Sequence, residues 1–121
     1  MAVQEIKWHK LELPEKLHPS QIKKGALVQV QYKNKKYCLG KNNAGWFAIP
    51  DKCPHAGASL SKGQLIEEKI VVCPLHRICF DITNGKNTSG EGYGMESFQV
   101  KKEDAFLYIA LPDKKWYQFW K

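Results

Sequence analysis

The chain has 121 residues and a mass of 13.9 kDa, which is the size of one ordinary domain. Its 43% hydrophobic and 26% charged residues exclude a disordered or collagen-like chain. No stretch approaches the ~18 consecutive apolar residues that a membrane span needs, and the first residues lack the pattern of a secretory signal. We therefore expect a cytoplasmic protein with no transmembrane segment, whose four cysteines are metal ligands or free thiols.

The net charge of +7 is concentrated in the first half of the chain. Residues 1–50 contain nine lysines and three glutamates, whereas residues 51–92 contain equal numbers of basic and acidic residues. No arginine-rich run and no interleaved stacking aromatic residues are present, so we expect no nucleic-acid partner. Two interpretations of the lysines remain open. They attract an acidic protein partner, or they form a solvated face that keeps strand edges from aggregating.

Short segments of alternating apolar and polar residues, separated by turn residues, predict an all-β domain. The expected strands begin at Ile6, Leu27, Tyr37 and Trp46 and continue at Ile70–Cys73, Cys79–Ile82, Ser97–Val100 and Phe106–Leu111. Lys33–Lys36 and Asn42–Gly45 are the expected turns, and Pro14–Lys24 is the one segment expected to hold a helical turn. Seven or eight strands at this spacing predict an antiparallel β barrel or sandwich.

The composition changes at Asp51, after which the chain is rich in Gly, Pro, Cys and His. We expect a single domain over residues 1–121. Residues about 1–50 and 93–121 form its β scaffold, and residues about 51–92 form an inserted subdomain. An irregular segment of this length inside a compact domain needs something to hold it, and function often resides there.

Two short segments of this insertion each contain one cysteine and one histidine. They are Cys53-Pro54-His55 and Cys73-Pro74-Leu75-His76. Thiolate and imidazole are ligands of zinc, copper and iron–sulfur centres, and the proline after each cysteine stiffens the turn that presents the sulfur. Gly57, Gly63 and Gly85 allow tight turns around a compact centre. Ligand type alone leaves two sites open: a tetrahedral Cys₂His₂ zinc site, and a [2Fe–2S] cluster with two cysteines on one iron and two histidines on the other.

The spacing favours the iron–sulfur site, because zinc fingers usually pair like ligands locally and here each segment mixes the two kinds. The two segments, followed by Phe80-Asp81 and Thr83-Asn84-Gly85, resemble the two cluster-binding boxes of Rieske proteins. The strands before and after the boxes fit the Rieske scaffold, so the resemblance covers most of the chain. It implies a Rieske-like antiparallel β barrel or sandwich with an inserted cluster-binding subdomain.

The resemblance also implies the ligands of a [2Fe–2S] cofactor. Cys53 and Cys73 would bind the buried iron. His55 and His76 would bind the outer iron, with the histidine end near the surface as the exit for electrons.

Five positions differ from the pattern of high-potential Rieske proteins. Ala58 and Leu75 stand where those proteins carry two further cysteines joined by a disulfide. Ile78 and Phe80 stand where a serine and a tyrosine donate hydrogen bonds to the cluster sulfurs, and Arg77 stands where a glycine is common. The first four differences imply the low-potential, soluble ferredoxin branch of the family.

The remaining notable residues have simpler interpretations. Cys38 and Cys79 are expected to pack in the core as small apolar side chains. The aromatic segment Trp116–Trp120 is expected to cover an open edge of the barrel, with a docking patch for a partner or a membrane surface as the alternative.

The implied function is electron transport. A Rieske ferredoxin of this size would take one electron from a reductase and pass it to an acceptor such as an oxygenase. Both redox partners would dock through an acidic surface. The chain has no room for a second cofactor, so we expect an electron-transfer component and not a catalyst alone. Two alternatives remain: a zinc-stabilised Cys₂His₂ binding module, and a small non-catalytic subunit of a larger reductase.

Overall fold

The structure is a computed structural model that describes residues 6–14, 17–53, 57–74, 79–83, 88 and 96–112. The strands in these residues are β1 (Ile6–Lys10), β2 (Leu27–Tyr32), β3 (Lys35–Asn42), β4 (Gly45–Pro50), β5 (Gln64–Ile66), β6 (Ile70–Val72), β7 (Cys79–Asp81), β8 (Phe98–Glu103) and β9 (Phe106–Pro112). Two short 3₁₀ helices, η1 (Pro19–Gln21) and η2 (Leu60–Lys62), complete the described elements. Every strand pair is antiparallel, which confirms the prediction of an all-β fold.

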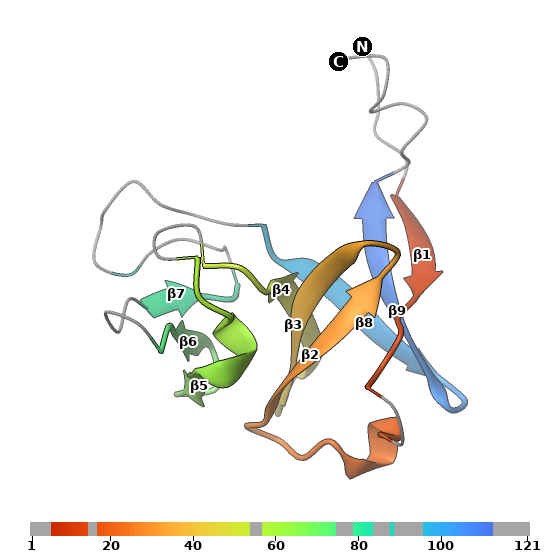
Figure 1. Cartoon of the computed structure of the whole chain (residues 1–121). Coiled ribbons are helices and arrows are strands. Elements are labelled where there is room, and N and C mark those ends of the chain that lie inside the picture. Colours follow the sequence, from red (N-terminus) through yellow and green to blue (C-terminus); the bar gives the residue numbers. More distant parts are fainter. Residues whose placement is uncertain are drawn as a thin grey trace, which may run out of the picture.

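Six of the strands form one strongly curved sheet in the order β1-β9-β8-β4-β3-β2 (Figure 1). The chain that leaves β1 closes this sheet into a barrel, because Glu12 forms a bridge with Gln31 on β2. The amide of Glu12 donates to the carbonyl of Gln31 at 2.7 Å, and the amide of Gln31 donates back at 2.9 Å. This bridge satisfies backbone groups of edge strand β2 that would otherwise be exposed.

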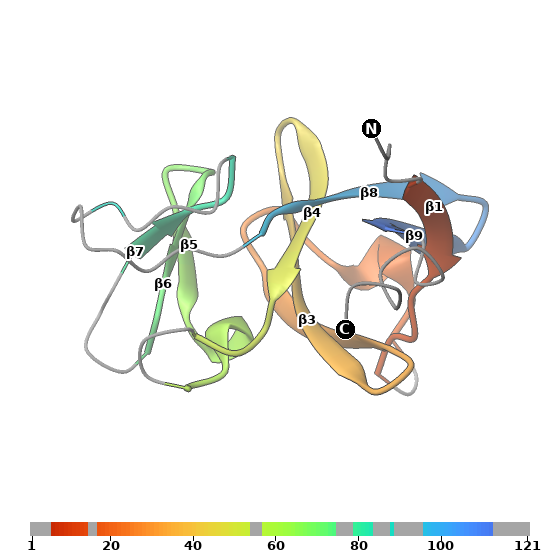
Figure 2. The same ribbon diagram turned by 90° about the horizontal axis from the view of Figure 1, so that it is seen from above.

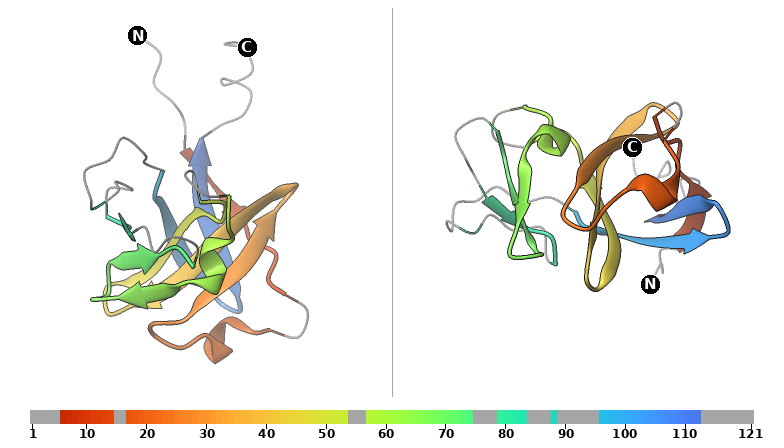
Figure 3. Two further views of the ribbon diagram at one scale, coloured as in Figure 1. Left: turned by 60° about the vertical axis from the view of Figure 1, so that its left-hand side comes forward. Right: turned by 90° about the horizontal axis from the view of Figure 1, so that it is seen from below.

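The other three strands form a small separate sheet in the order β5-β6-β7. Figures 2 and 3 show this sheet beside the barrel, as a second, smaller lobe. The chain enters the lobe after β4 and returns to the barrel at β8, so the lobe is an insertion between two hydrogen-bonded neighbours of the barrel sheet.

Two hydrophobic cores follow from this layout. The barrel core contains the inward-facing residues of β2, β3, β4 and β9, in which Leu107, Ile109 and Leu111 alternate with more exposed neighbours. The second core, here called the inter-sheet core, lies where the lobe packs against β3 and β4. It comprises Cys38, Phe47, Ile49, Cys53, Leu60, Val71, Cys73, Phe80 and Ile82.

Hydrogen bonds between two turns also join the lobe to the barrel. The β5–β6 turn approaches the β3–β4 turn, and Glu68 accepts hydrogen bonds there from the amide (2.7 Å) and the side chain (2.6 Å) of Asn43. The side chain of Asn42 donates to the carbonyl of Glu68 at 2.7 Å. The same side chain fixes its own turn, because its oxygen accepts from the amides of Ala44 and Gly45.

All of the expected strands are present, and the structure has one more that the sequence missed. The nine strands of the described residues exceed the seven or eight expected, because β5 was not foreseen. This strand has only three residues, and its apolar side chains are half-buried or exposed, so it carries no clear alternation. The helical turn expected within Pro14–Lys24 is η1. No helix in the described part of the chain is long and apolar enough to cross a membrane.

Candidate metal centre

The first cysteine segment begins three residues after the end of β4. Two backbone hydrogen bonds close the turn around Cys53: its amide donates to the carbonyl of Ala58 at 2.9 Å, and its carbonyl accepts from the amide of Gly57 at 2.8 Å. Gly57 has a φ of +73°, a left-handed conformation that side chains other than glycine's adopt at a cost. The expectation of a glycine-dependent turn is therefore confirmed at this position.

Asp51, two residues before Cys53, anchors this turn to the barrel. It is the one charged residue that is buried among those the structure describes, with 4% of its surface exposed. Its carboxylate accepts hydrogen bonds from Nε2 of Gln29 (2.7 Å), Oγ of Ser59 (2.6 Å) and the amide of Ser61 (2.9 Å). Its carbonyl accepts from the amide of Leu60 at 2.6 Å. Asp51, which precedes Cys53, is therefore bonded to the three residues that follow the cysteine turn, Ser59, Leu60 and Ser61.

These hydrogen bonds also set the charge of the carboxylate. Burial alone raises the pKa of Asp51, but the donors from Ser59, Gln29 and Ser61 together outweigh burial and hold the pKa below its ordinary value. A buried charge is tolerated only when such donors satisfy it. Sequence analysis did not find this residue, because an aspartate after a strand usually indicates an exposed turn. The serines at 59 and 61 are the only signal that the sequence offered.

The second cysteine segment follows β6 directly, so the sheet positions Cys73. Gly63, at the end of η2, packs against the carbonyl of Val72, the residue before Cys73. A Cβ at Gly63 would lie 1.9 Å from that oxygen, a distance that no side chain tolerates. The expectation that Gly63 permits a close approach is confirmed, and this contact joins the segment after the first turn to the strand that leads into the second.

The residues after the second segment lie along β7. Phe80 is fully buried in the inter-sheet core, and Thr83 turns back to Asp81, donating from its amide at 2.8 Å and from its hydroxyl at 2.5 Å. The hydrogen bonds from Thr83 lower the pKa of the Asp81 carboxyl. The amide of Ile82 donates to the carbonyl of Lys69 at 2.8 Å, which ties the end of β7 to the β5–β6 turn.

The structure brings the two predicted cysteine ligands together. Cys53 and Cys73, 1% and 0% exposed, belong to the same inter-sheet core, and neither forms a disulfide. The predicted ligands His55 and His76 lie outside the described residues. Within the described ranges no three metal-binding side chains gather. The structure therefore shows the positions of the two predicted cysteine ligands but not those of the two predicted histidine ligands.

The other two cysteines differ from this pair. Cys38 is fully buried in the same core, as expected. Burial, with a further contribution from the charge of Asp51, raises the pKa of the Cys38 thiol far above its ordinary value. Cys38 lies on β3, outside the two Cys-Pro segments, and no role as a ligand is proposed for it. The expectation for Cys79 is wrong: it lies on the short strand β7 with its side chain partly exposed, because Phe80 takes the inward-facing position.

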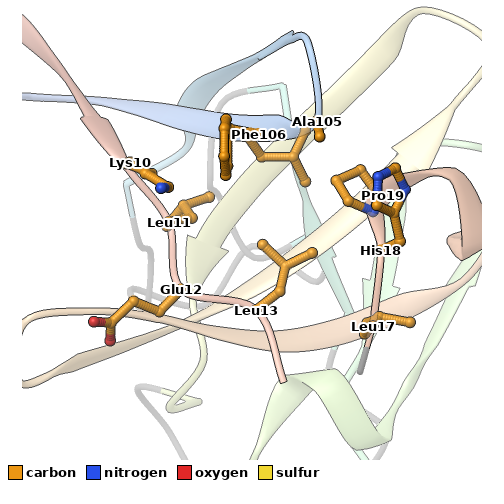
Figure 4. A pocket seen from close by; sticks show the side chains of 10 residues that line it. Lys10, Leu11, Glu12, Leu13, Leu17, His18, Pro19, Ala105 and Phe106 are labelled. Atoms are coloured by element: carbon orange, nitrogen blue, oxygen red, sulfur yellow. The ribbon is translucent and has the colours of Figure 1, made fainter. Parts of the chain in front are cut away.

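A pocket of about 530 Å³ lies elsewhere on the molecule, between the chain after β1, η1 and the β8–β9 turn (Figure 4). Its lining residues are Lys10, Leu11, Glu12, Leu13, Leu17, His18, Pro19, Ala105, Phe106 and Leu107. It contains no cysteine and none of the predicted ligands, so the predicted chemistry does not belong to it.

The fold is an antiparallel barrel with an inserted lobe, and two buried cysteines lie in the core between the barrel and the lobe. Residues 13–99 match the Rieske [2Fe-2S] domain, and the chain belongs to this family. The resemblance stated from the sequence is therefore confirmed. The cofactor of the family is a [2Fe–2S] cluster, and two buried cysteines in the same core, neither of them in a disulfide, suit the sulfur ligands of one of its irons.

The known proteins that are similar to the chain differ in how much of their own length it covers. Apoptosis-inducing factor 3 of Homo sapiens is 36% identical over 93 residues, which are 76% of this chain but 15% of that protein. The chain thus spans only a small part of that relative. The 3-phenylpropionate/cinnamic acid dioxygenase ferredoxin subunit of Photorhabdus laumondii is 31% identical over 71 residues, 58% of this chain and 68% of that subunit.

A solved structure shares the fold. The ferredoxin of Sphingomonas yanoikuyae B1 superposes with a TM-score of 0.70, covering 86% of this chain and all of that one, at 24% sequence identity. At this identity the likeness concerns the fold alone, and it confirms the predicted Rieske-like arrangement of barrel and inserted lobe.

Proposed function

We propose that the chain is a Rieske-type ferredoxin that carries single electrons from a reductase to an acceptor such as an oxygenase. The observation that carries this proposal is the convergence of Cys53 and Cys73 in one buried core, on turns that the barrel and the lobe hold independently. The dioxygenase ferredoxin subunits among the relatives support it. A bound [2Fe–2S] cluster supplies the one-electron couple.

In this proposal Cys53 and Cys73 bind one iron, and His55 and His76 bind the other. The two cysteines lie in the core between the barrel and the lobe, where burial excludes water. The hydrogen bonds of Asp51 and the close approach of Gly63 hold the backbone on either side of the sulfurs. A backbone held on both sides of the sulfurs reduces the structural change that accompanies gain or loss of an electron, which suits a carrier.

We also propose the chain's role in the electron-transfer system, its cellular location, its division into two parts and the kind of surface through which its partners dock. The chain acts as an electron-transfer component and not as a catalyst alone. It works in the cytoplasm, where cysteines more often serve as metal ligands or free thiols than in disulfides. The single domain divides at about residues 51 and 92 into scaffold and cluster-binding subdomain, and β5, β6 and β7 all lie within the latter. Its redox partners dock through acidic surfaces.

The four cysteines provide a matched test of the ligand assignment. Cys53→Ser and Cys73→Ser should each abolish the visible absorption and the reduced-state EPR signal of a Rieske cluster in protein purified without air. Cys38→Ala and Cys79→Ser, which remove a buried and a half-exposed thiol outside the proposed set, should retain both signals. An intact Rieske spectrum in both of the first two variants would refute the assignment. A colourless protein with zinc would favour the alternative of a zinc-stabilised module.

A further inference from the structure

We propose that a group of exposed lysines beside the first ligand turn is the docking surface for an acidic redox protein. This group, here called the lysine rim, consists of Lys33, Lys35, Lys36, Lys52 and Lys62. The inference rests on the proposed function, because it assumes that electrons leave near the two cysteine turns. It goes further by assigning partner recognition to one small part of a chain whose lysines are widely spread.

Backbone contacts place the rim at the first ligand turn. The carbonyl of Lys36, on the β2–β3 hairpin, accepts a hydrogen bond of 3.2 Å from the amide of Asp51. Tyr37 pairs with Pro50, the last residue of β4, so the hairpin end of β3 runs beside the chain that leads to Cys53. The lysines of the β2–β3 hairpin, far from Cys53 in sequence, are therefore its neighbours in the fold.

The other two lysines border the same turn from its own side. Lys52 lies directly before Cys53 and forms a β-bridge with Ser59, and Lys62 ends the 3₁₀ helix that follows. Ser59 bonds the Asp51 carboxylate, so both lysines lie on the segment that this carboxylate anchors. The lysine rim thus borders the first ligand turn from two sides, the β2–β3 hairpin and the segment that leads to η2.

The rim has an excess of positive charge. All five lysines are exposed, and none forms a salt bridge with another described residue. Asp51 is buried and its carboxylate is occupied by internal donors, so it does not neutralise the surface. Among the described residues, the exposed acids near the rim are Glu12, bridged to Gln31 opposite Lys36, and Glu96, whose charge raises the pKa of Tyr37. Within the part of the chain that the structure describes, five exposed cations against these two acids leave a surface that attracts an acidic protein.

A second lysine pair, at the other end of the same strand, provides the control. Lys23 and Lys24 are both exposed, and Gly25, which follows them, donates a hydrogen bond of 2.8 Å to the carbonyl of Lys41. Strand β3 runs from Lys35 to Asn42, so this pair lies at the end of the barrel away from the first ligand turn. Reversing two charges at either end changes the net charge equally.

The experiment measures electron transfer from the dithionite-reduced holoprotein to two haem proteins by stopped-flow spectroscopy. Cytochrome b5 serves as the acidic acceptor and cytochrome c as the basic one. Wild type, K35E/K36E and K23E/K24E are compared at low and high salt. Matching visible spectra and urea midpoints establish that the three proteins are equally folded and loaded.

The proposal predicts that K35E/K36E reduces cytochrome b5 about tenfold more slowly than wild type at low salt and loses most of the salt dependence. K23E/K24E should stay within about twofold of wild type, and cytochrome c should react faster with K35E/K36E. Wild-type rates in K35E/K36E, or equal losses in both double variants, would overturn the docking surface while leaving the carrier function intact. A wild-type protein that takes no electrons from dithionite would refute the proposed function itself, and the docking surface with it.

Discussion

The side-chain amide of Gln29 donates a hydrogen bond of 2.7 Å to the buried carboxylate of Asp51, and this contact joins strand β2 of the barrel to the segment that carries Cys53. The two residues are 22 positions apart in sequence. Ser59 and Ser61 complete the set of donors from the far side of the cysteine turn. The first turn is thus held by the barrel through one carboxylate.

Asp51→Ala should therefore lower the stability of the folded protein. It leaves three partly buried donors without their acceptor, and we expect the free energy of unfolding to fall by about 2–4 kcal/mol. Gln29→Ala removes a single donor, so its loss should be smaller, about 1–2 kcal/mol. Urea unfolding of the anaerobic holoprotein measures both, and a loss below about 0.5 kcal/mol for Asp51→Ala would show that the network does not anchor the turn.

The close contact between Gly63 and the carbonyl of Val72 leads to a second prediction about stability. A Cβ at Gly63 would lie 1.9 Å from that oxygen, so Gly63→Ala must displace either η2 or the strand before Cys73. We expect a loss of about 1–3 kcal/mol, measured as a lower urea midpoint. The neighbouring variant Lys62→Ala, at an exposed position, should stay within about 0.5 kcal/mol of wild type. Equal midpoints for the two variants would contradict the close approach.

The raised pKa of buried Tyr37 leads us to expect that the protein loses folding stability at alkaline pH. Burial, followed by the charges of Glu96 and Tyr32, raises the pKa of Tyr37 above its ordinary value of 10.0. Because the folded-state pKa is raised, the stabilisation is fully present below pH 10 and is lost as the pH rises through the folded-state value. The raised pKa of Cys38 acts in the same direction.

Tyr37→Phe should therefore reduce the loss of stability above pH 10, and thermal unfolding from pH 8 to pH 11 provides the measurement. Tyr108→Phe is the control, because Tyr108 is half-buried and lies outside both cores. An alkaline profile for Tyr37→Phe identical to wild type would show that this hydroxyl is not responsible.

Phe80 predicts a low reduction potential. It is fully buried in the core that holds Cys53 and Cys73, and it occupies the position from which a tyrosine donates to sulfur in high-potential Rieske proteins. Reduction adds negative charge, so each hydrogen bond to the sulfurs favours the reduced state. Such a bond to a charged group is worth about 1.5–3 kcal/mol, or roughly 65–130 mV for one electron.

The wild-type midpoint should lie nearer the −150 mV end than the +300 mV end of the range known for Rieske centres. Phe80→Tyr should raise it by up to about 100 mV, as measured by voltammetry. Phe47→Tyr, in the same core but on β4, tests for a general effect of a buried hydroxyl. A wild-type midpoint above about +100 mV would contradict the argument.

Sequence periodicity was sufficient to predict the barrel, because its strands have one buried face. On β9 the side chains of Leu107, Ile109 and Leu111 are buried and their neighbours are less so, which is the pattern the sequence showed. The lobe was less predictable. Its strands have three residues each, too few to show a period, and β6 is buried at all three positions.

For the candidate site, the sequence singled out the residues that we predict to be ligands, but not the residues that position them. Cys53 and Cys73 stand out by residue type and by the proline that follows each. Asp51 does not, because its role depends on Gln29, a residue on a strand whose neighbourhood only the fold reveals. The position of the hairpin lysines beside the first turn is likewise a consequence of strand pairing, which no local pattern encodes.

Elemental analysis of the protein purified without air tests the central claim most directly. If Cys53 and Cys73 share the ligation of a Rieske cluster with His55 and His76, the protein should be red-brown and contain about two irons and two acid-labile sulfides per chain, without zinc. A colourless protein with one tightly bound zinc per chain and no sulfide would contradict the account.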